Sequence, residues 1–353
     1  MNKVLFIVGN ELYKEFFGSS IFSIRNLNSI YNYFGKANVD VYSIQNKSSS
    51  LQKNIDRLYF RLSYLTKIHE KEILDKIDKY TFVFIDASSY GKLAKSIKLK
   101  NPQIKIAVFF QNVEYDYAIL EKKYFIQRFL ISKIAFKNEL WTCKYSDTII
   151  ALNSRDARRI EKLYKRKVDK IIPISLQNRQ IEFSREKIGG HLTALFVGSN
   201  FFANISGISW FIEKVLPFVS IKLKIVGKNM DKANLPKNEK MEIFGYIENL
   251  DRCIQDADFM ISPIFKGSGM KVKTCEALMH GKNIIGTHEA FEGYDMDFEK
   301  VGACCETANE FIEAINEFPK RFTHKFNEYS RKVFLEKYTD EIVFKQFAEV
   351  FEL

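Results

Sequence analysis

The chain has 353 residues, of which 46% are hydrophobic and 27% are charged. This length exceeds what one hydrophobic core usually supports, so the sequence predicts about two domains. The composition is ordinary for a soluble globular protein, and no run of about 18 uncharged apolar residues is present to span a bilayer. We therefore expect a folded chain without a transmembrane helix.

The N-terminal apolar run is followed by Glu11 and Lys14 where a signal peptide would have small residues, so we predict a first β-strand there. The five cysteines are odd in number and lack C-x-x-C spacing, which argues against a disulfide framework and a structural zinc site. The five histidines also lack ligand spacing. We expect no metal, no cofactor and a reducing, cytoplasmic location.

The net charge of +11 is unevenly placed along the chain. Residues 1–180 hold 32 Lys and Arg against 17 Asp and Glu, a net charge of +15, whereas residues 181–353 carry −4. A basic first half favours an anionic partner, either a membrane surface or a nucleic acid. A solvated, Lys-rich surface explains the same excess. Because no recognised nucleic-acid motif is present, we expect no nucleic acid.

Short apolar stretches alternate with helical patterns throughout the chain. In the first half they are residues 4–9, 39–44, 82–87, 104–110 and 147–153. After the polar residues 178–190, the pattern restarts with 193–199, 221–227, 241–247, 259–264 and 283–287. Near-continuous apolar strands separated by helices indicate parallel sheets buried on both faces. We predict two Rossmann-like, doubly wound α/β domains facing a central cleft, with ligands at the carboxyl ends of the strands.

The most informative stretch is KGSGMKVKTCEALMHGKNIIGT, residues 266–287. Gly267 and Gly269 let backbone N–H groups approach an anion, and a helix that starts just after them presents the positive end of its dipole. Lys271 and Lys273 add formal charge. The stretch is therefore predicted to hold a pyrophosphate.

Glu276 lies about one turn into this helix. From that position its carboxylate can accept both hydroxyls of a ribose whose phosphates lie at the helix start, and a nucleoside diphosphate needs both contacts. The alternative is that Glu276 caps the helix or pairs with Lys273 on a surface helix.

Four stretches in a fixed order carry a family resemblance. They are ALNSRDARRIEKLY (151–164), LFVGSNFFANISGISWFIEKVLP (195–217), IFGYIENLDRCIQDADFMISPI (243–264) and GSGMKVKTCEALMHGKNIIGT (267–287). Together they resemble bacterial glycosyltransferases of the GT-B fold, in the retaining, group-1-like and family-4-like set that includes many hexosyltransferases of polysaccharide synthesis. Each stretch alone is a weak signal, and their order makes the set specific.

The resemblance implies that the second domain binds a nucleotide-sugar donor. The residues that it assigns to the donor are Gly198, Asn204, Gly245, Tyr246, Gly267, Ser268, Gly269, Met270, Lys271, Lys273 and Glu276. His288, Glu289 and Glu292 follow the last marked strand, where they either line the cleft or lie on the loop surface.

Three positions depart from the family pattern. Many relatives carry a sugar-proximal glutamate eight positions before the ribose-binding one, where this chain has Ser268. Relatives often place Arg and Lys after the first strand of the donor domain, where this chain has Ser199, Asn200 and Phe201. Gln111 stands where a histidine is frequent. The phosphates must then be held mainly by the two lysines after the glycines and by backbone dipoles, and a histidine base is disfavoured.

These departures bear on mechanism. A retaining transferase of this fold needs little from side chains, because the leaving phosphate oxygen can accept the proton of the acceptor. An inverting transferase would need a general base, for which Glu114 and Asp116 are the candidates and Asp86 is a third. Each of these carboxylates fits a helix cap or a pair with a surface lysine equally well. We favour retention.

The first domain is predicted to bind the acceptor. Gly18 and Ser19 lie in a turn after the first strand, and Gln111 and Asn112 follow the fourth, so all four are candidates for acceptor or cleft contacts. Alternatively, Gly18 merely closes a loop and Ser19 or Ser20 caps the next helix.

Residues 124–141 mix aromatic, aliphatic and basic side chains at near-helical spacing. On the surface, such a helix suits anionic lipid, with the basic residues 155–167 extending the charge. If the segment is buried, it is a core helix whose solvent-facing side carries Arg128, Lys133 and Lys137. We favour the core for its apolar face and expect the cations to attract a membrane-borne acceptor.

The domain boundaries follow from these assignments. We predict an acceptor domain over 1–178, a linker over 179–190, a donor domain over 191–335, and a final helix over 336–353 that crosses back to the first domain. Residues 340–353 place five apolar side chains on approximately one helical stripe, which needs a hydrophobic partner.

The resemblance implies a cytoplasmic enzyme at the inner face of the cell membrane. It would transfer a hexose-type sugar from a nucleoside diphosphate to a glycan or lipid-linked acceptor in surface polysaccharide or glycoprotein assembly. Two alternatives stay open. One is a catalytically silent partner or scaffold of an active transferase, which the Ser268 and Gln111 departures motivate. The other is a sugar-nucleotide epimerase of the same fold, which would want acidic residues and histidines in the cleft.

Overall fold

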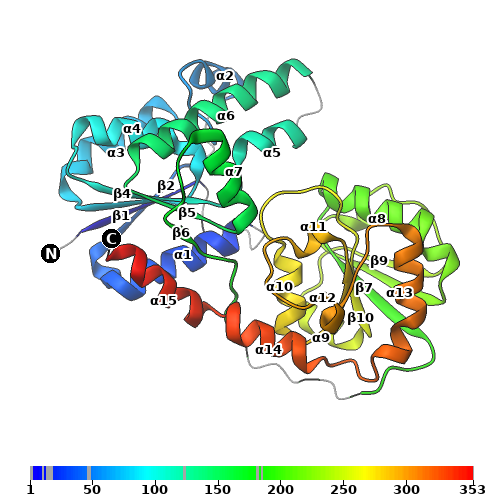
Figure 1. Ribbon diagram of the computed structural model, residues 1–353. Helices are drawn as coiled ribbons and strands as arrows, with labels where there is room; N and C mark the ends of the chain where they lie inside the picture. The colour runs from blue at the N-terminus through cyan, green and yellow to red at the C-terminus, as the bar shows by residue number, and fades with distance from the viewer. Residues whose placement is uncertain are drawn as a thin grey trace. The chain divides into compact units, whose positions relative to one another are not determined.

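The computed structural model describes residues 3–9, 12, 19–45, 49–121, 125–179, 183 and 186–352. It divides into two compact units, each built on its own six-stranded sheet (Figure 1). The first unit is Met1–Ile174 with Glu341–Leu353, and the second is Ser175–Asp340. The prediction of two Rossmann-like α/β domains is confirmed.

The first sheet has the strand order β2-β1-β3-β4-β5-β6, and every neighbouring pair is parallel. Its strands are β1 (Val4–Val8), β2 (Val39–Ser43), β3 (Phe82–Ile85), β4 (Lys105–Phe110), β5 (Thr148–Ala151) and β6 (Lys170–Ile171). All five residues of β1 are buried. This is the continuous apolar pattern that a central parallel strand requires, because helices cover both of its faces.

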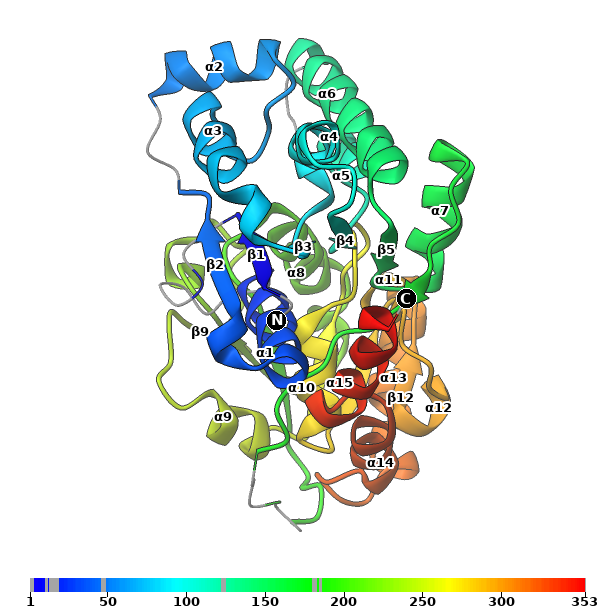
Figure 2. The ribbon, with the colours of Figure 1, turned by 90° about the vertical axis from the view of Figure 1, so that its left-hand side faces the viewer.

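Helices cover both faces of the first sheet. They are α1 (Ser19–Phe34), α2 (Ser50–Leu58), α3 (Lys67–Lys76), α4 (Gly91–Lys100), α5 (Glu114–Glu121), α6 (Phe125–Tyr145), α7 (Ser154–Tyr164) and α15 (Asp340–Phe351). In Figures 1 and 2, α1 and α15 lie together on one face, and α3, α4 and α6 lie on the other.

The second sheet has the order β12-β11-β10-β7-β8-β9 and is also parallel. Its strands are β7 (Leu192–Val197), β8 (Ile221–Val226), β9 (Met241–Phe244), β10 (Phe259–Ser262), β11 (Asn283–Gly286) and β12 (Gly302–Cys304). Two short strands, β6 and β12, were not predicted, because two or three residues are too few to show a periodic pattern.

The helices of the second unit are α8 (Phe202–Lys214), α9 (Leu250–Asp256), α10 (Val272–Met279), α11 (His288–Phe291), α12 (Phe298–Val301), α13 (Ala308–Arg321) and α14 (Glu328–Lys337). The rings of Phe211 in α8 and Phe311 in α13 meet edge to face at 5.8 Å, and Phe318 of α13 lies 4.5 Å from Phe259 of β10. These fully buried aromatic side chains fix α8 and α13 on one face of the sheet.

The stretch predicted as a linker lies within the second unit. Lys187 forms a β-bridge with His324, and Arg179 pairs with Asp251 at 2.9 Å. The first unit ends at Ile174, four residues before the predicted boundary.

The last helix packs in the first unit. Phe347 of α15 is fully buried, with its ring 6.1 Å from Phe84 of β3 and 6.4 Å from Phe109 of β4. Phe351 of the same helix contacts Phe34 of α1 at 5.0 Å. The apolar stripe of residues 340–353 therefore fills one side of the first core.

The favoured interpretation of residues 124–141 is wrong for the first part of that helix. The second half of α6 is buried, through Ala135, Asn138, Glu139, Thr142 and Cys143. In its first turns, however, Phe125, Ile126, Phe129 and Leu130 are all more than half exposed. Near-helical apolar spacing indicates an amphipathic helix but cannot tell whether its apolar face is covered by protein.

We predict that Phe347→Ala lowers the free energy of unfolding of the first unit by about 3–5 kcal/mol, because it leaves a cavity between α15 and the sheet. Hydrogen exchange of β3 and β4 amides measures this loss. Lys345→Ala, an exposed change on the same helix, is the control and should stay within about 0.5 kcal/mol. Equal protection in both variants would contradict the packing role of α15.

Candidate functional site

The carboxyl ends of the second sheet bring three glycine-containing turns together. Gly198 follows β7, Gly227 follows β8 and Gly245 follows β9. A Cβ at Gly227, whose φ is +149°, would lie 2.0 Å from the carbonyl oxygen of Gly198, so only glycine fits there. Gly227 N in turn donates to the Gly245 carbonyl at 3.1 Å. Gly198, Gly245 and the exposed Tyr246 thus share one edge, whereas Gly227 was not predicted as part of the site.

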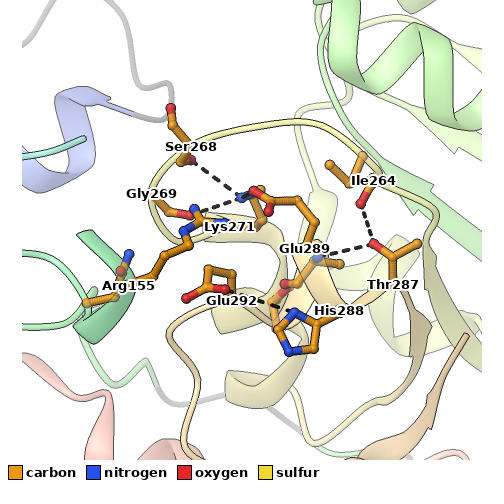
Figure 3. Close-up of polar contacts among 12 residues, drawn as sticks. Arg155, Ile264, Ser268, Gly269, Lys271, Thr287, His288, Glu289 and Glu292 are labelled. Carbon is orange, nitrogen blue, oxygen red and sulfur yellow. Dashed lines mark hydrogen bonds and ion pairs between the residues drawn. The ribbon is translucent and has the colours of Figure 1, made fainter. Parts of the chain in front are cut away.

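The loop after β10 forms the next part of this edge. Gly269 has a left-handed φ of +61°, which glycine adopts without strain. The turn directs the carbonyls of Ser268 and Gly269 toward Lys271, whose Nζ donates to them at 3.4 and 3.0 Å (Figure 3). Met270 is buried and anchors the loop. The loop therefore encloses the ammonium group of Lys271.

Lys271 also pairs with a carboxylate from the neighbouring helix. Its Nζ lies 2.7 Å from Glu289 Oε1, and the two side chains are only 13% and 17% exposed. A Cβ on Gly267 would lie 3.2 Å from the same Glu289 oxygen. The pair packs directly on the glycine loop, which makes Lys271 a cation held next to backbone groups that can bind an anion. No sequence spacing predicted that Glu289 pairs with Lys271.

Three side chains hold the backbone around this pair. The Tyr294 hydroxyl donates to the Lys271 carbonyl at 2.7 Å, and Thr274 Oγ1 donates to the Ala290 carbonyl at 2.8 Å. Thr287 donates to the Ile264 carbonyl, and its oxygen accepts from Ala290 N at 3.2 Å as the N-cap of α11 (Figure 3). The positions of Lys271 and Glu289 are thereby fixed by α10 and α11.

Lys273 lies deeper than predicted. Its Nζ donates to Asn204 Oδ1 at 2.7 Å and stands 4.6 Å from the centre of the Phe196 ring. Burial, together with the nearby charge of Lys271, lowers the pKa of Lys273 to about 7. Asn204 in turn contacts the loop after β7, because its Nδ2 donates to the Ser199 carbonyl at 2.9 Å. Lys273 thus positions the turn after β7.

Glu276 is a largely buried carboxylate in the middle of α10. Burial raises the pKa of Glu276 to about 7, an effect that the charges of Arg179 and Lys273 partly offset. Among the described residues its carboxylate has neither a hydrogen bond nor an ion pair, so the predicted alternatives of a cap or a Lys273 pair are absent there. Such a group is a strong acceptor for a ligand hydroxyl.

The first unit contains a cavity of about 560 Å³ at the carboxyl ends of β1, β3 and β4. Its polar floor is Asp86, whose carboxylate accepts hydrogen bonds from Ser23, from Asn26 at 2.5 Å and from Gln111 at 3.0 Å. Burial raises the pKa of Asp86 to about 6 despite these bonds. Asn112 also lines the cavity.

The two candidate bases differ in their surroundings. Glu114 lines the cavity, whereas the Asp116 carboxylate accepts two hydrogen bonds from Arg159, both at 2.7 Å. Such a bidentate pair orients the Asp116 carboxylate toward Arg159. Buried Glu139 accepts from the backbone N–H groups of Glu114 and Tyr115 at 2.8 and 3.0 Å, and so fixes the start of α5.

Two predicted acceptor residues are not placed by the structure. Gly18 lies outside the described residues, and Ser19 begins α1 without a described side chain. Ser20 and Ser23 of the same helix line the cavity, and Ser23 was not predicted.

Comparison with solved structures shows the same two-domain architecture. The lipopolysaccharide outer core galactosyltransferase WaaB is 14% identical, with a TM-score of 0.68 over 99% of this chain and 100% of that one. HepE from Anabaena, solved with UDP and glucose, is 9% identical, with a TM-score of 0.69 over 100% of both chains. A glycosyltransferase from Rickettsia africae is 13% identical, with a TM-score of 0.64 over 99% of this chain and 98% of that one.

Family comparison agrees for part of the chain. Residues 191–319 match the model of the family described as glycosyl transferases group 1. No curated protein matches the chain. The matched residues contain the glycine turns, the Lys271–Glu289 pair and Glu276. The second unit is therefore similar to the group 1 glycosyltransferase family over residues 191–319, and the chain as a whole has the fold of GT-B glycosyltransferases.

Proposed function

We propose that the protein transfers a hexose-type sugar from a nucleoside diphosphate to a glycan or lipid-linked acceptor, with retention, in surface polysaccharide or glycoprotein assembly. One observation carries the proposal most. Within the stretch that matches group 1 glycosyltransferases, the largely buried carboxylate of Glu276, which has no hydrogen bond or ion pair to any described residue, lies one turn into the helix after a glycine loop that encloses a lysine.

The donor fits this arrangement through two separate charges. The diphosphate accepts from backbone N–H groups at the start of α10 and from Lys271, which exchanges contacts with Glu289 and the loop carbonyls for the phosphate. The ribose hydroxyls donate to Glu276, which relieves the cost of burying that carboxylate. Because HepE was solved with UDP and with UDP-glucose, UDP-sugars are the first donors to test.

We propose retention from the family resemblance. Asp116 is engaged by Arg159, and Gln111 cannot act as a base. Glu114 and Asp86 line the cavity of the first unit and are the bases that an inverting reaction would use instead. In the proposed reaction the bond between the anomeric carbon and the phosphate oxygen breaks, and the acceptor oxygen bonds to the anomeric carbon. The acceptor proton passes to the leaving phosphate oxygen. Lys271 stabilises the charge that develops on that phosphate.

We predict that Glu276→Ala weakens binding of the UDP-sugar by about 1.5–3 kcal/mol, or roughly 10- to 150-fold in Kd, because the ribose loses a charged acceptor. Isothermal titration calorimetry with the wild type and the variant measures this. Glu313→Ala, an exposed change on α13, is the control. An affinity within twofold of the wild type would contradict the ribose role.

The same titrations separate the enzyme from its rivals. A panel of UDP-, GDP-, ADP- and CDP-sugars that yields binding with slow hydrolysis supports the transferase. If no nucleotide sugar in the panel is bound or hydrolysed, the catalytically silent scaffold is supported. Interconversion of sugar epimers supports the epimerase.

A pH dependence follows from the pKa of about 7 at Glu276. Only the ionised carboxylate accepts both hydroxyls, and about one tenth of it is ionised one pH unit below its pKa. The ratio of the Kd of Glu276→Gln to that of the wild type should therefore rise by up to about tenfold between pH 6 and pH 8. Taking the ratio cancels the titration of the nucleotide. A ratio that stays constant with pH would show that Glu276 does not titrate in this range.

We also propose that turnover needs no metal ion. Within the described residues, no group of three or more His, Cys, Asp and Glu side chains is arranged to hold one. Lys271 and the start of α10 supply the positive charge instead. Turnover should be unchanged by EDTA, and a loss that Mg²⁺ or Mn²⁺ restores would refute metal independence.

The location proposed for the enzyme is the cytoplasm, peripheral at the inner face of the cell membrane. No helix in the described part of the chain combines the length and apolar character that crossing a bilayer requires. The +15 charge of residues 1–180 supports attraction to anionic lipid.

A further inference from the structure

The cavity of the first unit has a cationic side. Lys53 and Arg57 are one turn apart on α2, and both line the cavity. No carboxylate of the described residues lies within ion-pair distance of either cation. The nearby Arg61 differs, because Glu70 neutralises it at 2.7 Å. Arg57 Nη1 donates to Asn54 Oδ1 at 3.0 Å, and Lys53 Nζ lies 5.2 Å from the Tyr64 ring. Both cations can therefore bind an anionic group inside the cavity without breaking an ion pair.

The carboxylates that line the same cavity are engaged elsewhere. Asp86 accepts from three side chains, as described above. Asp56 accepts from Gln52 at 3.0 Å, and its other oxygen lies 3.8 Å from Arg61. Glu114 likewise interacts with another residue. These contacts leave the positive charge on the α2 side to face an incoming anion.

Next to the cavity, α5 and α6 expose a continuous apolar face. We call this face the apolar ridge. It consists of Ile119, Leu120, Phe125, Ile126, Phe129 and Leu130, with exposed fractions from 37% to 73%. The four residues of α6 recur at positions that share one side of a helix. An exposed apolar cluster of this kind marks an interaction surface.

Cations frame the ridge as well. The Arg128 guanidinium lies 5.6 Å from the Phe125 ring, and Lys133 Nζ lies 5.2 Å from the Phe129 ring. Aromatic side chains accompanied by cations suit the boundary between anionic headgroups and hydrocarbon.

The ridge adjoins the cavity along the chain. Ala118 of α5 and Ile131 of α6 line the cavity, and each directly adjoins a ridge residue in the chain. Figures 1 and 2 show α2, α5 and α6 at the same end of the first unit. A ligand held at Lys53 and Arg57 can therefore continue along the ridge.

We propose that the acceptor is a membrane-borne amphiphile that carries a phosphate. Its phosphate binds Lys53 and Arg57 in the cavity, its polar part lies on the Asp86 floor, and its hydrocarbon chain leaves along the apolar ridge into the bilayer. This inference rests on the proposed transferase function and specifies the chemical class of its acceptor.

Other partners match only one part of the surface. A nucleic acid or a soluble anionic glycan would satisfy the cations but leave the apolar ridge in water. A docked protein would cover the ridge but has no need of cations inside a cavity. An anionic amphiphile satisfies both parts and places the ridge at the lipid surface.

The first experiment tests the ridge. The full chain is sedimented with vesicles of phosphatidylcholine alone and of phosphatidylcholine mixed with phosphatidylglycerol. We expect salt-sensitive binding to the mixed vesicles, reduced at least about tenfold by Phe129→Ser with Leu130→Ser. The control is Phe218→Ser with Leu335→Ser, which removes apolar side chains that are 67% and 42% exposed in the second unit. Equal loss in both double variants, or equal binding to neutral and mixed vesicles, would overturn the ridge assignment.

The second experiment tests the cations. Dodecyl phosphate and the uncharged dodecyl maltoside are titrated below their micelle concentrations. We expect the phosphate to bind more tightly, and Lys53→Ala with Arg57→Ala to weaken it about tenfold or more. Lys67→Ala with Lys71→Ala, a pair of exposed lysines one turn apart on α3, is the matched control. Equal affinities for the two probes, or equal loss in the two variants, would refute the phosphate site.

UDP-sugar binding is measured on every variant to separate this inference from the function on which it rests. None of the changed residues belongs to the donor site, so donor affinity should stay at the wild-type value. If the wild type binds a donor but fails both lipid experiments, the amphiphilic acceptor is wrong and the transferase stands. If no nucleotide sugar binds the wild type, the transferase itself fails.

Discussion

A buried ammonium group organises the candidate donor site of the second unit. Lys273 comes from α10, yet it donates to Asn204 of α8, and Asn204 holds the carbonyl of Ser199 after β7. A buried cation without a hydrogen-bond partner is destabilising. The contacts from Lys273 through Asn204 to Ser199 therefore hold α10 next to the turn after β7. The Lys271 loop, the glycine turns and Glu276 all take their places around it. Lys273, which the sequence assigns to the donor, also supports the turn after β7 in this structure.

More of the strands than of the side-chain contacts in the site could be predicted from the sequence. Buried parallel strands read as uninterrupted apolar runs, so ten of the stretches could be located by pattern alone. Glu276 was also within reach, because its spacing from the glycine loop is local along one helix. The pairing of Lys271 with Glu289 was not, since it joins residues 18 positions apart through the register of β10 and β11. Pairings of that kind depend on tertiary structure and leave no periodic signal.

The same limit explains the outcome for the first unit. Asp116 and Glu114 are close neighbours in the sequence and looked equivalent, but only the fold brings Arg159 onto Asp116 and Glu139 onto the start of α5. The exposed first turns of α6 have the composition of a core helix, and nothing in their periodicity tells whether protein or lipid covers them. A candidate site built on one loop and helix is therefore easier to predict than a cavity assembled from α1, α2, α5 and α6.

The return of α15 to the first unit has a consequence for synthesis. Domains usually fold in the order in which they leave the ribosome. Here the first core lacks Phe347 until almost the whole chain has been made, whereas every residue of the second unit precedes Glu341. The face of β3 and β4 that later receives α15 stays open to solvent throughout translation of the second unit. In this protein the first unit is thus completed only after the second, when Glu341 and the residues that follow it have been made.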